Sequence, residues 1–117
     1  MNEHNNSDCI FCKIIDGKIP SRKVYEDGKI LAFHDINQSF PVHILCVPKI
    51  HIESLNEVNG ENIEYVSHII EKIPEIAKSF GIDGGYRVIT NIGEDGGQSV
   101  NHLHFHVIGG KKLGYLG

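Results

Sequence analysis

The stretch that decides the fold is His102-Leu103-His104-Phe105-His106-Val107-Ile108, close to the end of the chain. Polar and apolar residues alternate along it, which is typical of a strand with one face in the core. Successive side chains of a strand point to opposite faces, so the three histidines lie on one face, about 6.7 Å apart. We therefore predict a strand over 102–108 that lines a site with imidazole rings.

Three histidines on one face allow several interpretations. A neutral imidazole can attack phosphorus and form a covalent intermediate, while a second imidazole protonates the leaving group. Three imidazoles could instead bind a catalytic zinc ion, although consecutive same-face positions form a row rather than a converging tripod. Histidines that occur in an ordinary strand by coincidence are the third interpretation. We favour nucleophilic catalysis because the loop Gly96-Gly97-Gln98-Ser99 directly precedes the strand, and its backbone amides can approach anionic oxygens.

The rest of the chain predicts short strands and one long helix. Strands are expected at 24–25, 30–33, 43–47 and 86–91, where short apolar runs are bounded by turn residues. A short helical turn is expected over 9–15. The long helix is expected to begin near 59–62 and to end at Gly81, with a kink or split at Pro74. Helical spacing predicts that its apolar face comprises Ile63, Val66, Ile70, Ile73, Ala77 and Phe80. The predicted fold class is α+β, an antiparallel meander sheet with the helices on one side.

Length and composition predict one domain over 9–117 behind a disordered polar tail over 1–8. The charge balance is mildly acidic, with 15 Asp and Glu against 11 Lys and Arg. Nucleic-acid-binding domains usually carry a basic face, so no nucleic acid partner is expected. No apolar stretch is long enough to span a membrane, and the first residues do not form a signal peptide. Three cysteines without such a signal favour thiols or a metal site in the cytoplasm over disulfides.

Together these motifs resemble the histidine triad (HIT) family, and most closely its Hint-like branch of purine nucleoside phosphoramidases. The resemblance covers 9–117. It rests on the Gly-Gly-Gln-Ser loop, the histidine strand and a series of blocks in the same order, which include Cys9-Ile10-Phe11-Cys12, Leu31-Ala32-Phe33-His34-Asp35-Ile36, Pro41-Val42-His43-Ile44-Leu45, Val47-Pro48-Lys49, His51-Ile52, Gly85-Tyr86-Arg87 and Gly109-Gly110.

The resemblance implies that His104 attacks the α-phosphorus of a purine nucleoside 5′-phosphoramidate or an aminoacyl-adenylate-like compound. Water then releases AMP or GMP from the nucleotidyl-histidine, and no catalytic cofactor is required. His106 and Ser99 would assist proton transfer to the leaving amine, and His43 would orient His104. The implied nucleotide-binding residues are Phe11, Phe33, His34, Asp35, Ile36, Asn91, Gly97, Gln98, Ser99, His104 and His106. A homodimer whose sheet extends across the interface is also implied.

The pair Cys9 and Cys12 raises the question of a structural metal. Their spacing places both sulfurs on one side of a helical turn, but a closed zinc site needs four ligands. Reduced, metal-free thiols are the alternative. Some bacterial HIT proteins that this chain resembles complete a zinc site with histidines at the positions of His51 and His102. Cys46, in an apolar run, is expected to be a small buried residue.

Two other functions remain open from the sequence. A dinucleoside polyphosphate hydrolase of the same family would attack the same phosphorus but expel a nucleotide. A nucleotide-binding scaffold protein would use the site only for contact with partners. Gly109-Gly110 favours the phosphoramidase branch, and the presence of His104 favours an enzyme, although the chain ends without the Trp-Pro-Pro segment usual in that branch.

Overall fold

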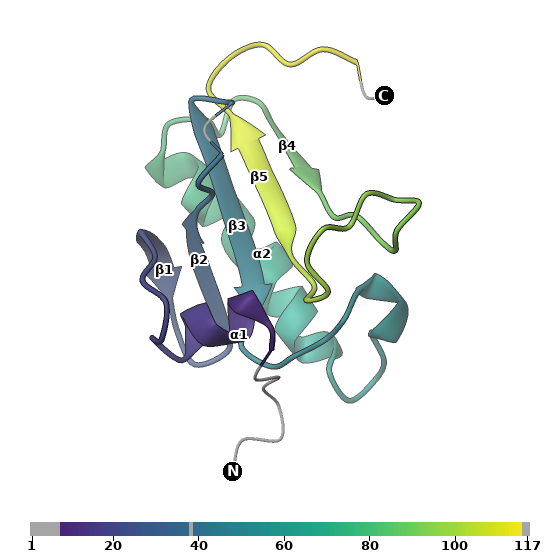
Figure 1. Cartoon of the computed structure of the whole chain (residues 1–117). Helices are drawn as coiled ribbons and strands as arrows, with labels where there is room; N and C mark the ends of the chain where they lie inside the picture. The colour runs from purple at the N-terminus through teal and green to yellow at the C-terminus, as the bar shows by residue number, and fades with distance from the viewer. Residues whose placement is uncertain (1–7, 38, 116–117) are drawn as a thin grey trace.

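The structure is a computed structural model that describes residues 8–37 and 39–115 (Figure 1). It is an α+β domain, as predicted. The expected tail lies outside the described residues except for Asp8. The elements are α1 (Ile10–Ile15), β1 (Lys23–Glu26), β2 (Ile30–His34), β3 (Val42–Pro48), a 3-10 turn (Leu55–Glu57), α2 (Ile63–Ser79), β4 (Tyr86–Ile89) and β5 (Phe105–Gly109). No helix within these residues is long and apolar enough to cross a membrane.

The five strands form one antiparallel sheet in the order β1-β2-β3-β5-β4. The final strand therefore lies between β3 and β4, so His106 is flanked by Leu45 on one side and Ile89 on the other. Strand β5 begins at Phe105, later than predicted, and the chain through His102 and His104 runs outside the regular ladder. Strand β5 begins at the end of the sheet nearest α1 (Figure 1).

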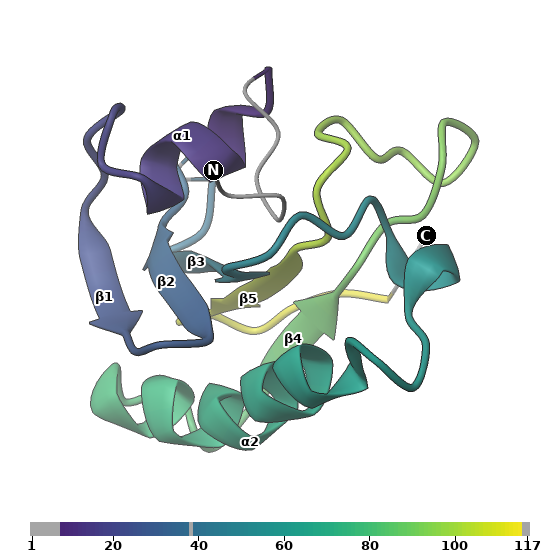
Figure 2. The same cartoon turned by 90° about the horizontal axis from the view of Figure 1, so that it is seen from below.

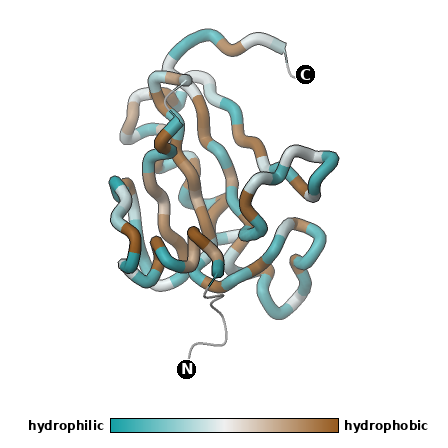
Figure 3. Tube along the Cα trace, viewed as in Figure 1, coloured by the Kyte–Doolittle hydropathy of each residue, from teal (hydrophilic) through white to brown (hydrophobic). Residues whose placement is uncertain are grey.

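The two helices cover opposite faces of the sheet, which corrects the expectation that both lie on one side (Figure 2). One apolar cluster joins α2 to one sheet face, and a second joins α1 to the other face. Alternate residues of β2 serve the two clusters, because Ile30 and Ala32 belong to the first and Leu31 and Phe33 to the second. Apolar residues accordingly run along the central strands (Figure 3).

Helix α2 differs from its prediction in phase and in continuity. Its buried residues are Val66, Ile69, Ile73, Ile76 and Ala77, whereas three residues assigned to the apolar face, Ile63, Ile70 and Phe80, are exposed. The helix also continues through Pro74 without the predicted split. Pro74 leaves the carbonyl of Ile70 without its helical donor, and Ile70 lies on the exposed face, where water can replace that donor.

The end of α2 is confirmed at Gly81. Its φ of +73° is the left-handed conformation that glycine adopts without strain. The amide of Ile82 donates to the carbonyl of Ala77 at 3.0 Å, and the amide of Gly81 donates to that of Lys78 at 3.0 Å. These two bonds form a Schellman motif, which ends the helix and turns the chain toward β4.

Candidate active site

A cavity of about 680 Å³ lies between α1 and the sheet. Its walls are mainly apolar, and two histidines of the predicted strand, His104 and His106, line it. Of the residues predicted to bind a nucleotide, those that line this cavity are Phe11, Phe33, His34, Asp35, Ile36, Ser99, His104 and His106. The fold thus gathers residues from α1, β2, the loop before the histidines and β5 around one space.

The ring of His104 is held in one orientation at the cavity wall. Its Nδ1 lies 2.7 Å from the carbonyl oxygen of His102. A carbonyl only accepts hydrogen bonds, so Nδ1 carries the proton and the lone pair of the neutral ring is on Nε2. The hydroxyl of Thr90 donates to the carbonyl of His104 at 2.8 Å, and Phe11 packs edge-on against the ring. Burial lowers the pKa of His104, which favours the neutral, nucleophilic form.

His106 follows on the same side of the strand. Its ring centroid lies 5.0 Å from that of His104. Burial, with a smaller effect of the neighbouring His104 and His43, lowers the pKa of His106 to about 4. The ring is therefore neutral at pH 7. Because Nδ1 of His106 contacts His43, its Nε2 is the nitrogen that remains for the cavity.

His43 contacts His106, whereas the resemblance implied that it orients His104. Nε2 of His43 lies 2.9 Å from Nδ1 of His106 and 3.2 Å from Oδ2 of Asp35. Nδ1 of His43 lies 3.1 Å from the carbonyl oxygen of Asn37. The register of β3 against β5 explains the change, because Leu45, two residues beyond His43 and on the same strand face, pairs with His106.

The glycine-rich loop is braced by the side chain of Gln98. Its Oε1 accepts the amide of Gly93 at 2.9 Å, and its Nε2 donates to the carbonyls of Glu53 at 2.7 Å and Val100 at 2.9 Å. Gly96 is required for packing, since a Cβ there would lie 2.3 Å from the carbonyl oxygen of Ile92. The loop is thus rigid enough to hold Ser99 at the cavity.

Three residues predicted to hold phosphate do not line the cavity: Asn91, Gly97 and Gln98. The amide of Gln98 is used within the loop, as described above. Gly97 has a φ of +83° and forms part of the turn. The structure therefore places Ser99, but not these three residues, at the cavity wall.

Several cavity residues were not identified from the sequence. Ile10 and Ile14 flank Phe11 on the same helix, and their helical spacing was the available signal. Leu45 lies on the floor, between Phe33 of β2 and His106 of β5. Ser21 was unpredictable: its hydroxyl is buried without a hydrogen-bond partner among the described residues, and it lines the cavity.

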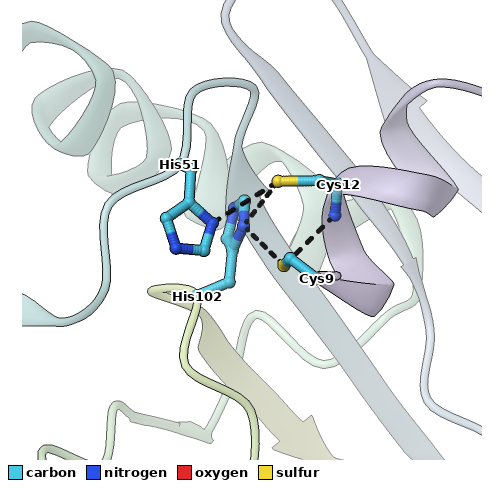
Figure 4. A group of neighbouring side chains, drawn as sticks. All are labelled: Cys9, Cys12, His51 and His102. Carbon is cyan, nitrogen blue, oxygen red and sulfur yellow. Dashed lines mark hydrogen bonds between the residues drawn. The ribbon is translucent and has the colours of Figure 1, made fainter. Parts of the chain in front are cut away.

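A second cluster forms where Cys9, the N-cap of α1, and Cys12 of α1 meet His51 and His102 (Figure 4). Nδ1 of His102 lies 3.3 Å from Sγ of Cys9 and 3.5 Å from Sγ of Cys12, and Nδ1 of His51 lies 3.4 Å from Sγ of Cys12. All four donor atoms lie within 4.8 Å of one another. These are the four residues that the resemblance implied as zinc ligands.

The donor set fits a tetrahedral metal ion. Bonds of about 2.3 Å to sulfur and about 2.0–2.1 Å to nitrogen give a sulfur–nitrogen separation of about 3.6 Å in a tetrahedron. His102 is oriented for this role because its Nε2 lies 3.0 Å from the carbonyl oxygen of Pro48, which leaves the Nδ1 lone pair directed at the sulfurs. Burial lowers the pKa of His102 to about 4, so the ring is neutral. Cys46 is fully buried elsewhere, and burial raises its pKa to about 12.

Comparisons with known proteins place this arrangement in one family. Residues 8–114 match the family model described as Scavenger mRNA decapping enzyme C-term binding. Protein HitA of Neisseria gonorrhoeae is 45% identical over 101 residues, which cover 86% of this chain and 94% of that protein. A histidine triad protein structure from Clostridium difficile is 53% identical with a TM-score of 0.92, and the match covers 97% of this chain and 99% of that chain. A HIT family hydrolase from Legionella pneumophila Philadelphia 1 is 41% identical with a TM-score of 0.88, and the match covers 92% and 96%.

Proposed function

The chain belongs to the histidine triad (HIT) family, whose members include hydrolases, and we propose that it hydrolyses the P–N bond of purine nucleoside 5′-phosphoramidates. Aminoacyl-adenylate-like compounds are included in this substrate class. The observation that carries the proposal is the tautomer of His104. With Nδ1 bound to a backbone carbonyl, the ring directs the Nε2 lone pair away from the main chain as a nucleophile.

In the first step, Nε2 of His104 attacks the α-phosphorus and the P–N bond breaks. The leaving nitrogen takes the proton from Nε2 of His106, and Nδ1 of His106 takes a proton from Nε2 of His43 in the same relay. The product amine departs. In the second step, water attacks the nucleotidyl-histidine, transfers its proton back through His106, and releases AMP or GMP.

The cavity walls support the nucleotide part of the proposal. Phe11 and Phe33 are in edge contact, with ring centroids 5.7 Å apart, and offer apolar surface to a purine. Asp35 lies at the end of β2 and would accept hydrogen bonds from ribose hydroxyls. Ser99 would donate to a phosphate oxygen. The same residues accept adenine or guanine, so AMP and GMP derivatives are both in the proposed substrate class.

We also propose that Cys9, Cys12, His51 and His102 bind a structural zinc ion, as the separations of their donor atoms support. The zinc would fasten α1 to the rest of the domain, and it takes no part in the reaction. None of Cys9, Cys12 and Cys46 forms a disulfide among the described residues. This state supports a reducing compartment, the cytoplasm, as the site of action.

A homodimer is the proposed assembly. Strand β4 is the edge of the sheet opposite β1, so its outer hydrogen-bonding groups are available to a second copy. Pairing of two such edges would extend the sheet across the interface.

The test is release of AMP from an adenosine 5′-phosphoramidate by wild type and by His104→Ala. We expect a loss of at least about 10³-fold in kcat/KM, because the nucleophile is removed. The matched control is His68→Ala, a half-buried histidine outside the cavity, which should retain wild-type activity. Equal rates in wild type and His104→Ala would refute the nucleophile assignment.

A second measurement separates the phosphoramidase from its relative in the family. Wild type should turn over the phosphoramidate faster than diadenosine tetraphosphate; the reverse order would identify a dinucleoside polyphosphate hydrolase. Rapid denaturation at neutral pH followed by mass spectrometry should show a nucleotide attached to His104. Tight AMP binding without turnover of either substrate would identify a nucleotide-binding scaffold protein.

A further inference from the structure

Three donor atoms converge beside the catalytic histidines, outside the Cys/His cluster. They are Oδ2 of Asp35, Nε2 of His43 and Nδ1 of His106, and all lie within 4.8 Å of one another. Nε2 of His43 is central, 3.2 Å from the carboxylate oxygen and 2.9 Å from the nitrogen of His106. The other carboxylate oxygen of Asp35 accepts the amide of Asn37 at 2.9 Å, which keeps Oδ2 directed toward His43.

The hydrogen-bond partner of Nδ1 of His43 explains why a cation is favoured between these three donor atoms. Nδ1 of His43 faces the carbonyl oxygen of Asn37, which only accepts, so Nδ1 carries a hydrogen. In a neutral ring, Nε2 of His43 would then place a lone pair against an ionised carboxylate. A proton on Nε2 removes this repulsion, and a metal ion bound between the three atoms would remove it equally well.

We propose that Asp35, His43 and His106 form a second, reversible site for a divalent transition metal such as zinc, and that the bound metal inhibits the enzyme. Two imidazoles and one carboxylate are donors that zinc accepts, with a fourth position left open. Tetrahedral bonds of about 2.0–2.1 Å require donor separations of about 3.3 Å. The two separations that involve His43, 2.9 and 3.2 Å, need changes of a few tenths of an ångström, and the third pair, Asp35 and His106, lies within 4.8 Å.

The surroundings meet the other requirements of a metal site. The carbonyl of Asn37 fixes the ring of His43 from behind, as outer partners of metal-bound histidines do. The ring of His106 is neutral at pH 7, as described above. Asp35 and His106 line the cavity, so an ion can enter from that side.

Inhibition rests on the proposed function, because it follows from the proton relay. Zinc binding sends the Nε2 proton of His43 to solvent and occupies Nδ1 of His106. The proton relay from His43 through His106 to the leaving nitrogen is then interrupted, because Nδ1 of His106 can no longer accept the proton of His43. The carboxylate of Asp35 is also withdrawn from the ribose hydroxyls. The metal would therefore act at the reacting centre, while the proposed zinc on the cysteines stays in place.

Zinc stoichiometry tests the site without reference to activity. Protein dialysed against micromolar free zinc at pH 7.5 should bind two ions in wild type, one in His43→Gln and one in Cys12→Ser. His68→Gln is the matched control, because His68 contacts Asp27 at 2.5 Å but forms part of no three-donor group among the described residues; it should bind two. Asp35→Asn should weaken zinc affinity at the second site at least about 10-fold. It provides an independent test of the same site if His43→Gln does not fold. One zinc in wild type, or two in a folded His43→Gln, would overturn the proposal.

Turnover tests the consequence. Zinc at concentrations that fill the second site should suppress AMP release from the phosphoramidate at least about 10-fold in wild type, and a chelator that leaves the first ion bound should restore it. Full activity with two zinc ions bound would overturn the inhibition. Absence of turnover even with one zinc bound would instead refute the proposed function and leave the metal site standing on its stoichiometry.

Discussion

His106 illustrates how neighbours decide the chemistry of a single residue. It is held between β3 and β4, opposite Leu45 and Ile89, and this position shields part of its ring from water. Burial therefore lowers its pKa to about 4. A histidine on an open strand would be partly charged at neutral pH, whereas this one stays neutral and keeps its Nε2 proton for transfer.

The pKa of His106 predicts how folding stability depends on pH. Its folded pKa lies below the ordinary histidine pKa of 6.5, so between these two pH values the unfolded chain binds more protons. Stability is therefore present above about pH 6.5 and is lost as the pH falls toward 4. From pH 7 to pH 5, wild type that holds a single zinc ion, on the cysteines, should lose roughly 1–2 kcal/mol more free energy of unfolding than His106→Gln in the same state. Urea unfolding at both pH values measures this, and equal losses in the two proteins would contradict the assignment.

The sequence could predict that the candidate reacting residues share one strand face, but it could not predict their partners. Alternation along a strand is a local property, so His104 and His106 could be assigned to one face from spacing alone. The contact between His43 and His106 depends on the register of strands far apart in the chain. The bracing role of Gln98 likewise depends on Glu53, which comes 45 positions earlier.

At the scale of elements, α1 depends on what surrounds it. A helix of six residues cannot be stable alone, because nucleation is unfavourable and few hydrogen bonds follow it. It is held by the apolar cluster beneath it and by the contacts of Cys9 and Cys12 with His102. Because α1 also supplies Phe11 to the cavity, loss of this attachment reaches the nucleotide site.

Cys12→Ser should therefore weaken AMP binding by about 10-fold, since it removes a zinc ligand and loosens the wall formed by α1. Calorimetric titration with AMP, together with proteolysis near residues 10–15, measures both effects. A strong zinc chelator should weaken AMP binding to wild type by a similar factor and have little further effect on the variant. Cys46→Ala changes a cysteine outside the cluster and should keep the wild-type response to the chelator. Unchanged AMP affinity in Cys12→Ser would show that α1 is held without the metal.

The helices show which features of an element are encoded locally. The presence, length and glycine cap of α2 follow from its spacing and from Gly81. Its rotational phase does not, because steps of three and four residues are both compatible with an apolar face, and packing against the sheet selected Ile69 and Ile76. The side of the sheet that α1 covers was also unpredictable, since it depends on the route of the chain between elements.

At the scale of the whole molecule, the two edges of the sheet differ. Strand β1 has a register shift between Lys23 and Tyr25 and charged residues at both ends, features that discourage pairing with another chain. Strand β4 has no such shift in its pairing with β5, and its Val88 is 40% exposed. On α2, Ile70 is 51% exposed. Because both side chains are apolar and exposed, we propose that β4 and α2 contribute to the dimer interface.

Val88→Lys and Ile70→Lys should each shift the protein from dimer to monomer, because a lysine on an edge strand or in an apolar contact must be desolvated when two copies meet. Light scattering coupled to size-exclusion chromatography over a concentration series measures the mass. Glu71→Lys is the control, since it adds positive charge one position from Ile70 at a highly exposed side chain, and it should remain dimeric. A monomeric wild type at high concentration would refute the dimer. If the dimer survives both lysine substitutions, its interface must lie on another face, because these exposed apolar side chains are then not part of the surface that association buries.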